Sequence, residues 1–112
     1  MQKNVSADIA SMSAPVATQQ VVVRSAHGLH FRPASEIAQR AQRFPCEISL
    51  SKEGKRVNGK SPLDILTLVA TQGVVLVVEA AGDQAEEAVA AIVDLFESNF
   101  PIPPRPTPSA TP

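Results

Sequence analysis

Four short segments of the chain carry the apolar patterns of β-strands. Residues 20–23 are rich in valine, and residues 47–51 alternate between polar and apolar side chains. Residues 56–58 follow after a turn at 52–55, so the two segments predict a hairpin. Residues 74–79 form a nearly continuous apolar run, which indicates a strand at the centre of the sheet.

Three helices are predicted between these strands and after the last one. The first has Pro33 in its first turn, which suits proline because the missing N–H would have no partner there. Its apolar stripe consists of Ala34, Ile37, Ala38 and Ala41. A short helix is predicted to start at Ser61, the N-cap, with Pro62 as its first helical residue. A long helix is predicted after Asp83, which forms a capping-box pattern with Glu86. The stripe of the long helix consists of Ala85, Ala88, Val89, Ile92, Leu95 and Phe96.

The element order βαββαβα predicts an α+β fold with one layer of helices on one face of a small sheet. The 112 residues have room for one domain, which we place at residues 18–100. Residues 1–17 show no hydrophobic period, so we predict a disordered N-terminal arm. Residues 101–112 are rich in proline, which suits neither helix nor sheet, and predict a disordered, extended tail.

Composition narrows the possible functions. The chain has ten basic and eleven acidic residues, and the basic ones do not gather in a stripe. It has four Phe and neither Trp nor Tyr, too few aromatic rings for a surface on which bases could stack. We therefore expect no nucleic-acid binding. The longest apolar stretch is too short for a bilayer, and no signal-peptide pattern occurs, so we expect a cytoplasmic protein without membrane insertion. The single cysteine, Cys46, excludes an internal disulfide and is interpreted as a core residue.

The segment 27–33 carries the candidate chemistry. It places His30 between a glycine-containing loop and a helix start, where free N–H groups and the helix dipole favour a phosphate. Arg32 adds a planar cation that can bond phosphate oxygens, and a neutral imidazole is a competent nucleophile. These residues indicate a phosphohistidine at His30, against the alternative of a helix cap or surface residue. His27 could share a metal with His30, but no further ligands evidently converge, so we expect no metal.

Residues 28–34 read Gly-Leu-His-Phe-Arg-Pro-Ala and resemble the active-site segment, Gly-Leu-His-x-Arg-Pro-Ala, of the HPr family. These are the histidine-containing phosphocarriers of the phosphoenolpyruvate-dependent phosphotransferase system. Lys60-Ser61 resembles the lysine–serine pair that opens the family's second helix. A third similarity is to the segment before the family's last strand, and it consists of Thr67-Leu68 and residues 71–73. The resemblance as a whole spans about residues 18–100.

The resemblance implies an open-faced sandwich, a four-stranded antiparallel sheet with three helices on one face. It implies that His30 is phosphorylated on Nδ1, that Arg32 orients the phosphate, and that N–H groups from Phe31 onward hold its oxygens. His27 stands where the family often has Ser, Thr or Asn, and either binds phosphate or is a surface residue. No cofactor is expected.

Ser61 matches a serine that a dedicated kinase modifies in some relatives, so a serine kinase/phosphorylase is a candidate partner. Pro62 and Asp64 depart from the pattern around that serine, and Asp64 would repel a phosphate one turn away. A plain N-cap explains Ser61 equally without modification.

The function implied is that of a phosphocarrier and not of an enzyme. The chain would accept a phosphoryl group from enzyme I and pass it to a downstream acceptor, for sugar uptake or nitrogen-type regulation, and we expect a monomer. The alternatives are a regulatory binding module controlled by phosphorylation at Ser61 or His30, and a domain excised from a larger phosphotransferase polyprotein.

Donor and acceptor must both reach His30, so they are expected to share one docking patch. Its predicted centre is apolar, formed by Phe31, Pro62 and Leu63, and its predicted rim is basic, formed by Arg32, Arg40 and Arg43. For Phe31 and Leu63, a place in the core is the alternative.

Overall fold

The computed structural model describes residues 16–100, so the predictions for residues 1–15 and 101–112 lie outside the described residues. The elements are β1 (Val16–Val22), α2 (Phe31–Ala41), β2 (Glu47–Lys52), β3 (Lys55–Asn58), α3 (Pro62–Leu66), β4 (Val75–Ala81) and α4 (Ala85–Glu97). Their order, βαββαβα, confirms the predicted α+β class.

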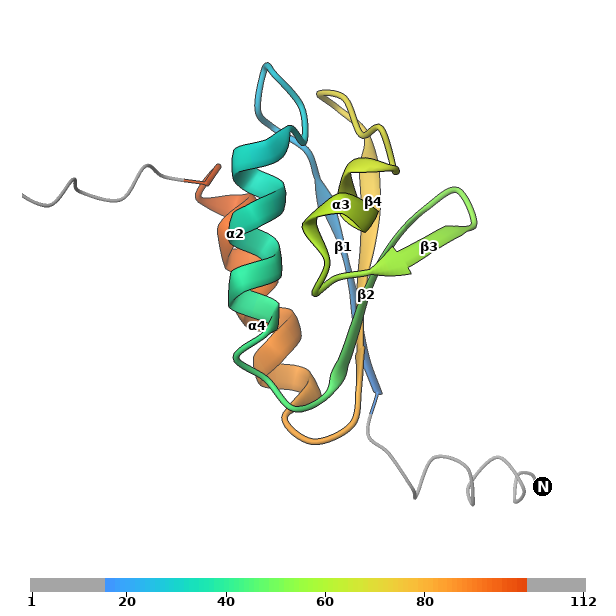
Figure 1. Ribbon diagram of the computed structural model, residues 1–112, viewed down its shortest axis with the longest axis vertical. Helices are drawn as coiled ribbons and strands as arrows, with labels where there is room; N and C mark the ends of the chain where they lie inside the picture. The colour runs from blue at the N-terminus through green and yellow to red at the C-terminus, as the bar shows by residue number, and fades with distance from the viewer. Residues whose placement is uncertain (1–15, 101–112) are drawn as a thin grey trace, which may run out of the picture.

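The four strands form one antiparallel sheet in the order β1-β4-β2-β3. The apolar strand β4 lies in the interior of the sheet, as predicted, where Val77 faces Gln20 of β1 and Ser51 of β2. Because β1 and β2 both pair with β4, the connection through α2 must cross the sheet. This crossing carries α2 over the sheet and brings the loop before it to the same end as the loop between α3 and β4 (Figure 1).

The core lies between the sheet and the helices, which cover one of its faces (Figure 1). Both predicted helical stripes are buried, including Ile37 of α2 and Ile92 and Phe96 of α4. Cys46 is also buried, as expected. Strand residues at alternate positions face this core, and the other face of the sheet exposes residues such as Val22 and Val75. One solvated face is ordinary for an antiparallel sheet.

The predicted start of the first strand was wrong. Strand β1 begins at Val16 rather than at residue 20, because its backbone pairs with β4 as far as Ala81. Val16 and Ala17 therefore belong to the domain and not to the arm. Thr18 and Gln19 show no apolar alternation, so their place in the strand follows only from the pairing partner.

The capping box predicted for the long helix was also wrong. Helix α4 begins at Ala85 after Gln84, whose backbone is left-handed (φ 67°) and whose side chain makes no capping bond. A backbone bond from the Ala85 N–H to the Gly82 carbonyl, 3.2 Å long, closes this turn instead. Asp83 therefore lies outside the cap position that its spacing from Glu86 predicted.

Candidate functional site

The loop before α2 is held in place by a close backbone contact with the α3–β4 loop. The Leu29 N–H donates to the Ala70 carbonyl at 2.8 Å, and the Leu29 side chain is buried. Gly28 has φ +70°, and a Cβ at this position would lie 2.7 Å from the Ala70 oxygen. Only glycine fits at position 28 without strain, so the loop presents His30, two residues further on, from a fixed backbone.

His30 is the N-cap residue of α2, with extended backbone angles of φ −97° and ψ −165°. Its side chain is exposed and makes no capping hydrogen bond to the helix. The alternative that the imidazole serves as the helix cap is therefore wrong. The first turn of α2 also contains no acidic residue, so the positive end of its dipole is not neutralised by a carboxylate within that turn.

His27 is brought beside His30, as a phosphate-binding role would require. The two ring centroids are 5.9 Å apart, and the rings are nearly perpendicular, at 88°. The backbone N–H of His27 donates to the Ser25 hydroxyl at 3.2 Å. Between residues 16 and 100, no group of three or more His, Cys, Asp or Glu side chains is placed to hold a metal ion.

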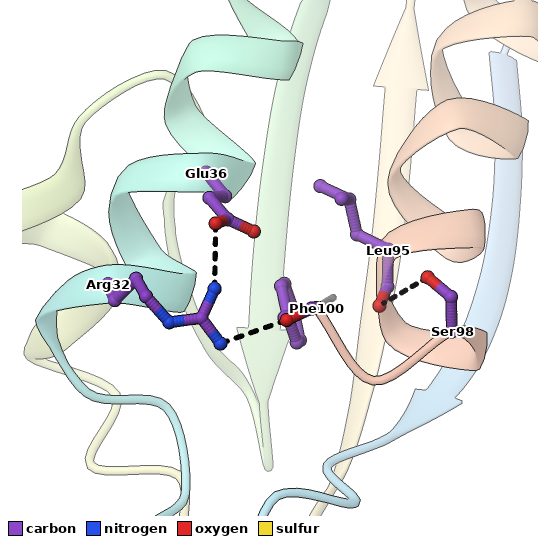
Figure 2. A network of polar contacts seen from close by, with 5 residues as sticks. All are labelled: Arg32, Glu36, Leu95, Ser98 and Phe100. Carbon is purple, nitrogen blue, oxygen red and sulfur yellow. Dashed lines mark hydrogen bonds and ion pairs between the residues drawn. The ribbon is translucent and has the colours of Figure 1, made fainter. Parts of the chain in front are cut away.

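Arg32 is already engaged by two acceptors. Figure 2 shows its guanidinium between Glu36, one turn along α2, and the end of α4. Nη1 donates to the Glu36 carboxylate at 2.7 Å, and Nη2 donates to the Phe100 carbonyl at 2.9 Å. Sequence reasoning missed both partners. The i,i+4 spacing is a signal that points to Glu36, whereas nothing local points to Phe100.

Helix α3 begins as the sequence predicts. Ser61 is its N-cap, with its hydroxyl accepting the Asp64 N–H at 3.3 Å, and Pro62 is in the first turn. The plain N-cap interpretation of Ser61 is thus confirmed as a structural role. Whether the hydroxyl is also phosphorylated stays a prediction.

The apolar residues of the predicted docking patch are largely exposed. Leu63 is 70% exposed and Phe31 is 63% exposed, so the alternative that these two residues belong to the core is wrong. Pro62 is half-buried. Val69, in the loop between α3 and β4, is 67% exposed with an unusual positive φ of 51°, and sequence reasoning did not single it out.

The two rim arginines differ in their surroundings. Arg43 is exposed. Arg40 instead donates from Nη1 to the Ala91 carbonyl of α4 at 3.3 Å, which draws it toward that helix. None of the helices between residues 16 and 100 has the length and apolar character needed to span a bilayer.

Comparisons with known proteins agree with this geometry. The family described as "PTS HPr component phosphorylation site" matches residues 17–98. The phosphocarrier protein HPr of Borreliella burgdorferi is 34% identical over 80 residues, which cover 71% of this chain and 93% of that protein.

Solved structures give the same result. HPr-C-His from Thermoanaerobacter tengcongensis matches with a TM-score of 0.72 at 40% identity, covering 75% of this chain and 94% of that one. Phosphocarrier protein HPr from Bacillus anthracis matches with a TM-score of 0.69 at 34% identity, covering 73% and 98% of the two chains. The chain therefore belongs to the HPr family, the phosphocarrier proteins of the phosphotransferase system.

Proposed function

We propose that this phosphocarrier holds its phosphoryl group on Nδ1 of His30. The observation that carries the proposal is the state of this side chain: an exposed imidazole at the start of α2 that makes no capping bond. A nucleophile of this kind can reach a phosphorylated partner without breaking any contact that holds the fold together.

Phosphoryl transfer replaces one bond to phosphorus by another. The Nδ1 lone pair of a neutral His30 forms the new P–N bond while the bond to the donor breaks, and its electron pair stays on the donor atom. Transfer to the acceptor reverses these roles, and the electron pair returns to Nδ1. Negative charge lies on the phosphoryl oxygens throughout, so the hydrogen-bond donors around His30 determine how readily the group moves.

The start of α2 supplies the first set of donors. The N–H groups in the first turn of a helix have no acceptor within the helix, and those of Phe31 and Arg32 follow His30 directly. With no carboxylate in this turn, the helix dipole favours an anion here.

Arg32 and His27 supply side-chain donors. A guanidinium has five N–H groups, and the bonds to Glu36 and Phe100 use one from each Nη. The remaining donors are available for phosphate oxygens, in a planar arrangement that suits them. His27 is edge-on to His30 at 5.9 Å and supplies a ring N–H to the phosphate.

Enzyme I is the proposed donor, and a downstream component of the phosphotransferase system is the proposed acceptor. Both dock on the patch formed by Phe31, Pro62 and Leu63, with Arg32 and Arg43 beside it. We place this exchange in the cytoplasm and expect the carrier to act as a monomer.

Modification of Ser61 by a serine kinase is a separate prediction. Its hydroxyl already accepts the Asp64 N–H, and a phosphate there would meet the Asp64 carboxylate one turn away.

Phosphorylation by enzyme I and phosphoenolpyruvate tests the proposal directly. The intact mass of the chain should rise by one phosphoryl group, and the modification should be labile in acid and stable in base, as a phosphoramidate is. His27→Ala should slow the reaction at most. Equal labelling of a His30→Ala variant would disprove the assignment to His30.

A further inference from the structure

Glu36 is the only acidic residue of α2, and its carboxylate faces the proposed phosphate-binding arginine. Glu36 Oε2 and Arg32 Nη1 are 2.7 Å apart, with 22% and 41% of the two side chains exposed. The other ion pair within residues 16–100, between Arg56 and Glu79, is longer, at 3.5 Å. The contact is thus close and partly shielded from solvent.

Helical spacing alone would favour a different partner for Glu36. Arg40 lies four residues after Glu36, and a glutamate that precedes its basic partner is the better order on a helix. In the structure Arg40 donates to the Ala91 carbonyl of α4 instead. Glu36 is left to Arg32, so the packing of α4 against α2 determines the pair.

The segment just after α4 holds the other side of the Arg32 guanidinium. Asn99 and Phe100 both have left-handed backbone, with φ of 59° and 51°, which asparagine tolerates but which is unfavourable for a bulky residue such as Phe100. The Phe100 ring compensates, because it is 3% exposed and packs edge-on against Phe96 at 4.9 Å. The Phe100 N–H also bonds the Leu95 carbonyl at 2.8 Å. The carbonyl that accepts from Arg32 is therefore firmly placed (Figure 2).

We propose that Glu36 is a positioning residue that competes with the phosphoryl group on His30 for Arg32. The inference rests on the proposed function. In the unphosphorylated carrier Glu36 accepts one Nη1 donor of Arg32 and neutralises much of its positive charge, so a phosphate at the start of the helix competes with that carboxylate for the guanidinium. A contact that is stronger in the unphosphorylated state shifts the phosphorylation equilibrium toward that state by the difference in its free energy between the two states. Glu36 thus keeps the phosphoryl group easy to pass on.

A competition for one phosphoryl pool measures this effect. Nitrogen-15-labelled parent and unlabelled Glu36→Gln protein are mixed with enzyme I and a limiting amount of phosphoenolpyruvate, and both masses are followed to equilibrium. Enzyme I exchanges phosphoryl groups between the two carriers, so the ratio of their phosphorylated fractions reports their relative affinity for the group. We expect about a two- to fivefold excess on Glu36→Gln, the effect of a partly exposed ion pair.

Two controls separate the possible causes. Glu79→Gln removes the same charge from the other ion pair, and its ratio to the parent should stay near one. Glu36→Gln should also lose its advantage when both competitors carry Arg32→Gln, because Glu36 acts through Arg32. Circular dichroism confirms that each variant is folded.

The outcomes are distinct. A labelled parent that takes no phosphate would refute the proposed function itself. If the carriers are phosphorylated but the ratio of their phosphorylated fractions is near one, only the role of Glu36 is refuted. The same holds if Glu79→Gln raises this ratio equally, or if Glu36→Gln still raises it when both competitors carry Arg32→Gln.

Discussion

Helices α2 and α3 both begin after an N-cap residue with extended backbone, but only α3 has a side chain that accepts one of its first N–H groups. Both N-cap residues have extended backbone, with ψ of −165° at His30 and 113° at Ser61. The Ser61 hydroxyl accepts a backbone N–H of α3, and Asp64 adds a carboxylate in the first turn. His30 makes no such bond, and α2 has no acidic residue in its first turn.

The difference separates a structural helix start from one suited to an external anion. In α3 the positive end of the helix is met by the chain's own side chains, which stabilises the helix. In α2 the same groups remain available, at a cost in stability that a bound phosphate would offset. An N-cap histidine that does not cap is therefore a more specific signal than the presence of a histidine near a helix.

Replacing His30, the N-cap residue of α2, should have the largest effect on phosphorylation. His30→Ser and His30→Ala should both lose phosphorylation completely, because neither provides an imidazole. The serine variant should be more stable than the alanine variant by about 1 kcal/mol, because its hydroxyl can cap the helix. Thermal or urea unfolding of the two proteins measures this difference. Equal stabilities would mean that α2 gains nothing from a cap.

Exposed apolar residues are a feature that the two helix starts share. Phe31→Glu and Leu63→Glu should each weaken binding to enzyme I by about 1–3 kcal/mol, because one lost anchor matters in a small transient interface. Both variants should stay folded, since both side chains are mostly exposed.

Titration of labelled enzyme I, with circular dichroism on each variant, provides the measurement. Val16→Glu is the matched control, because Val16 is 58% exposed in edge strand β1 and lies outside the predicted patch. Folded Phe31 and Leu63 variants that bind like this control would rule out the patch.

Removing the cap at α3 should have the smallest effect. Ser61→Ala should lower the free energy of unfolding by about 1 kcal/mol, because the Asp64 N–H loses its acceptor. Phosphorylation of His30 by enzyme I should stay within about twofold of the parent, since α3 is proposed to contribute docking surface and not phosphate ligands. Urea unfolding measures the loss of stability, and the phosphorylation assay measures the reaction of His30. A large loss of phosphorylation in a folded variant would contradict the division between the two helix starts.

Local patterns determined much of this protein from the sequence alone. The buried stripes of α2 and α4 repeat every three to four residues, and strand β4 is a nearly continuous apolar run. The candidate site is equally local, because His30 and Arg32 lie two residues apart at one helix start. Periodicity and capping act over a few residues, so they can be interpreted without knowing the fold.

Only the tertiary structure decided features that depend on distant residues. The exposure of Leu63 follows from how α3 sits on its neighbours, and the first residues of β1 are in a strand only because β4 lies beside them. The requirement for glycine at 28 comes from the Ala70 carbonyl. Arg32 contacts Phe100 across 68 positions of sequence, and this contact forms only when α4 packs against α2, which no local pattern encodes.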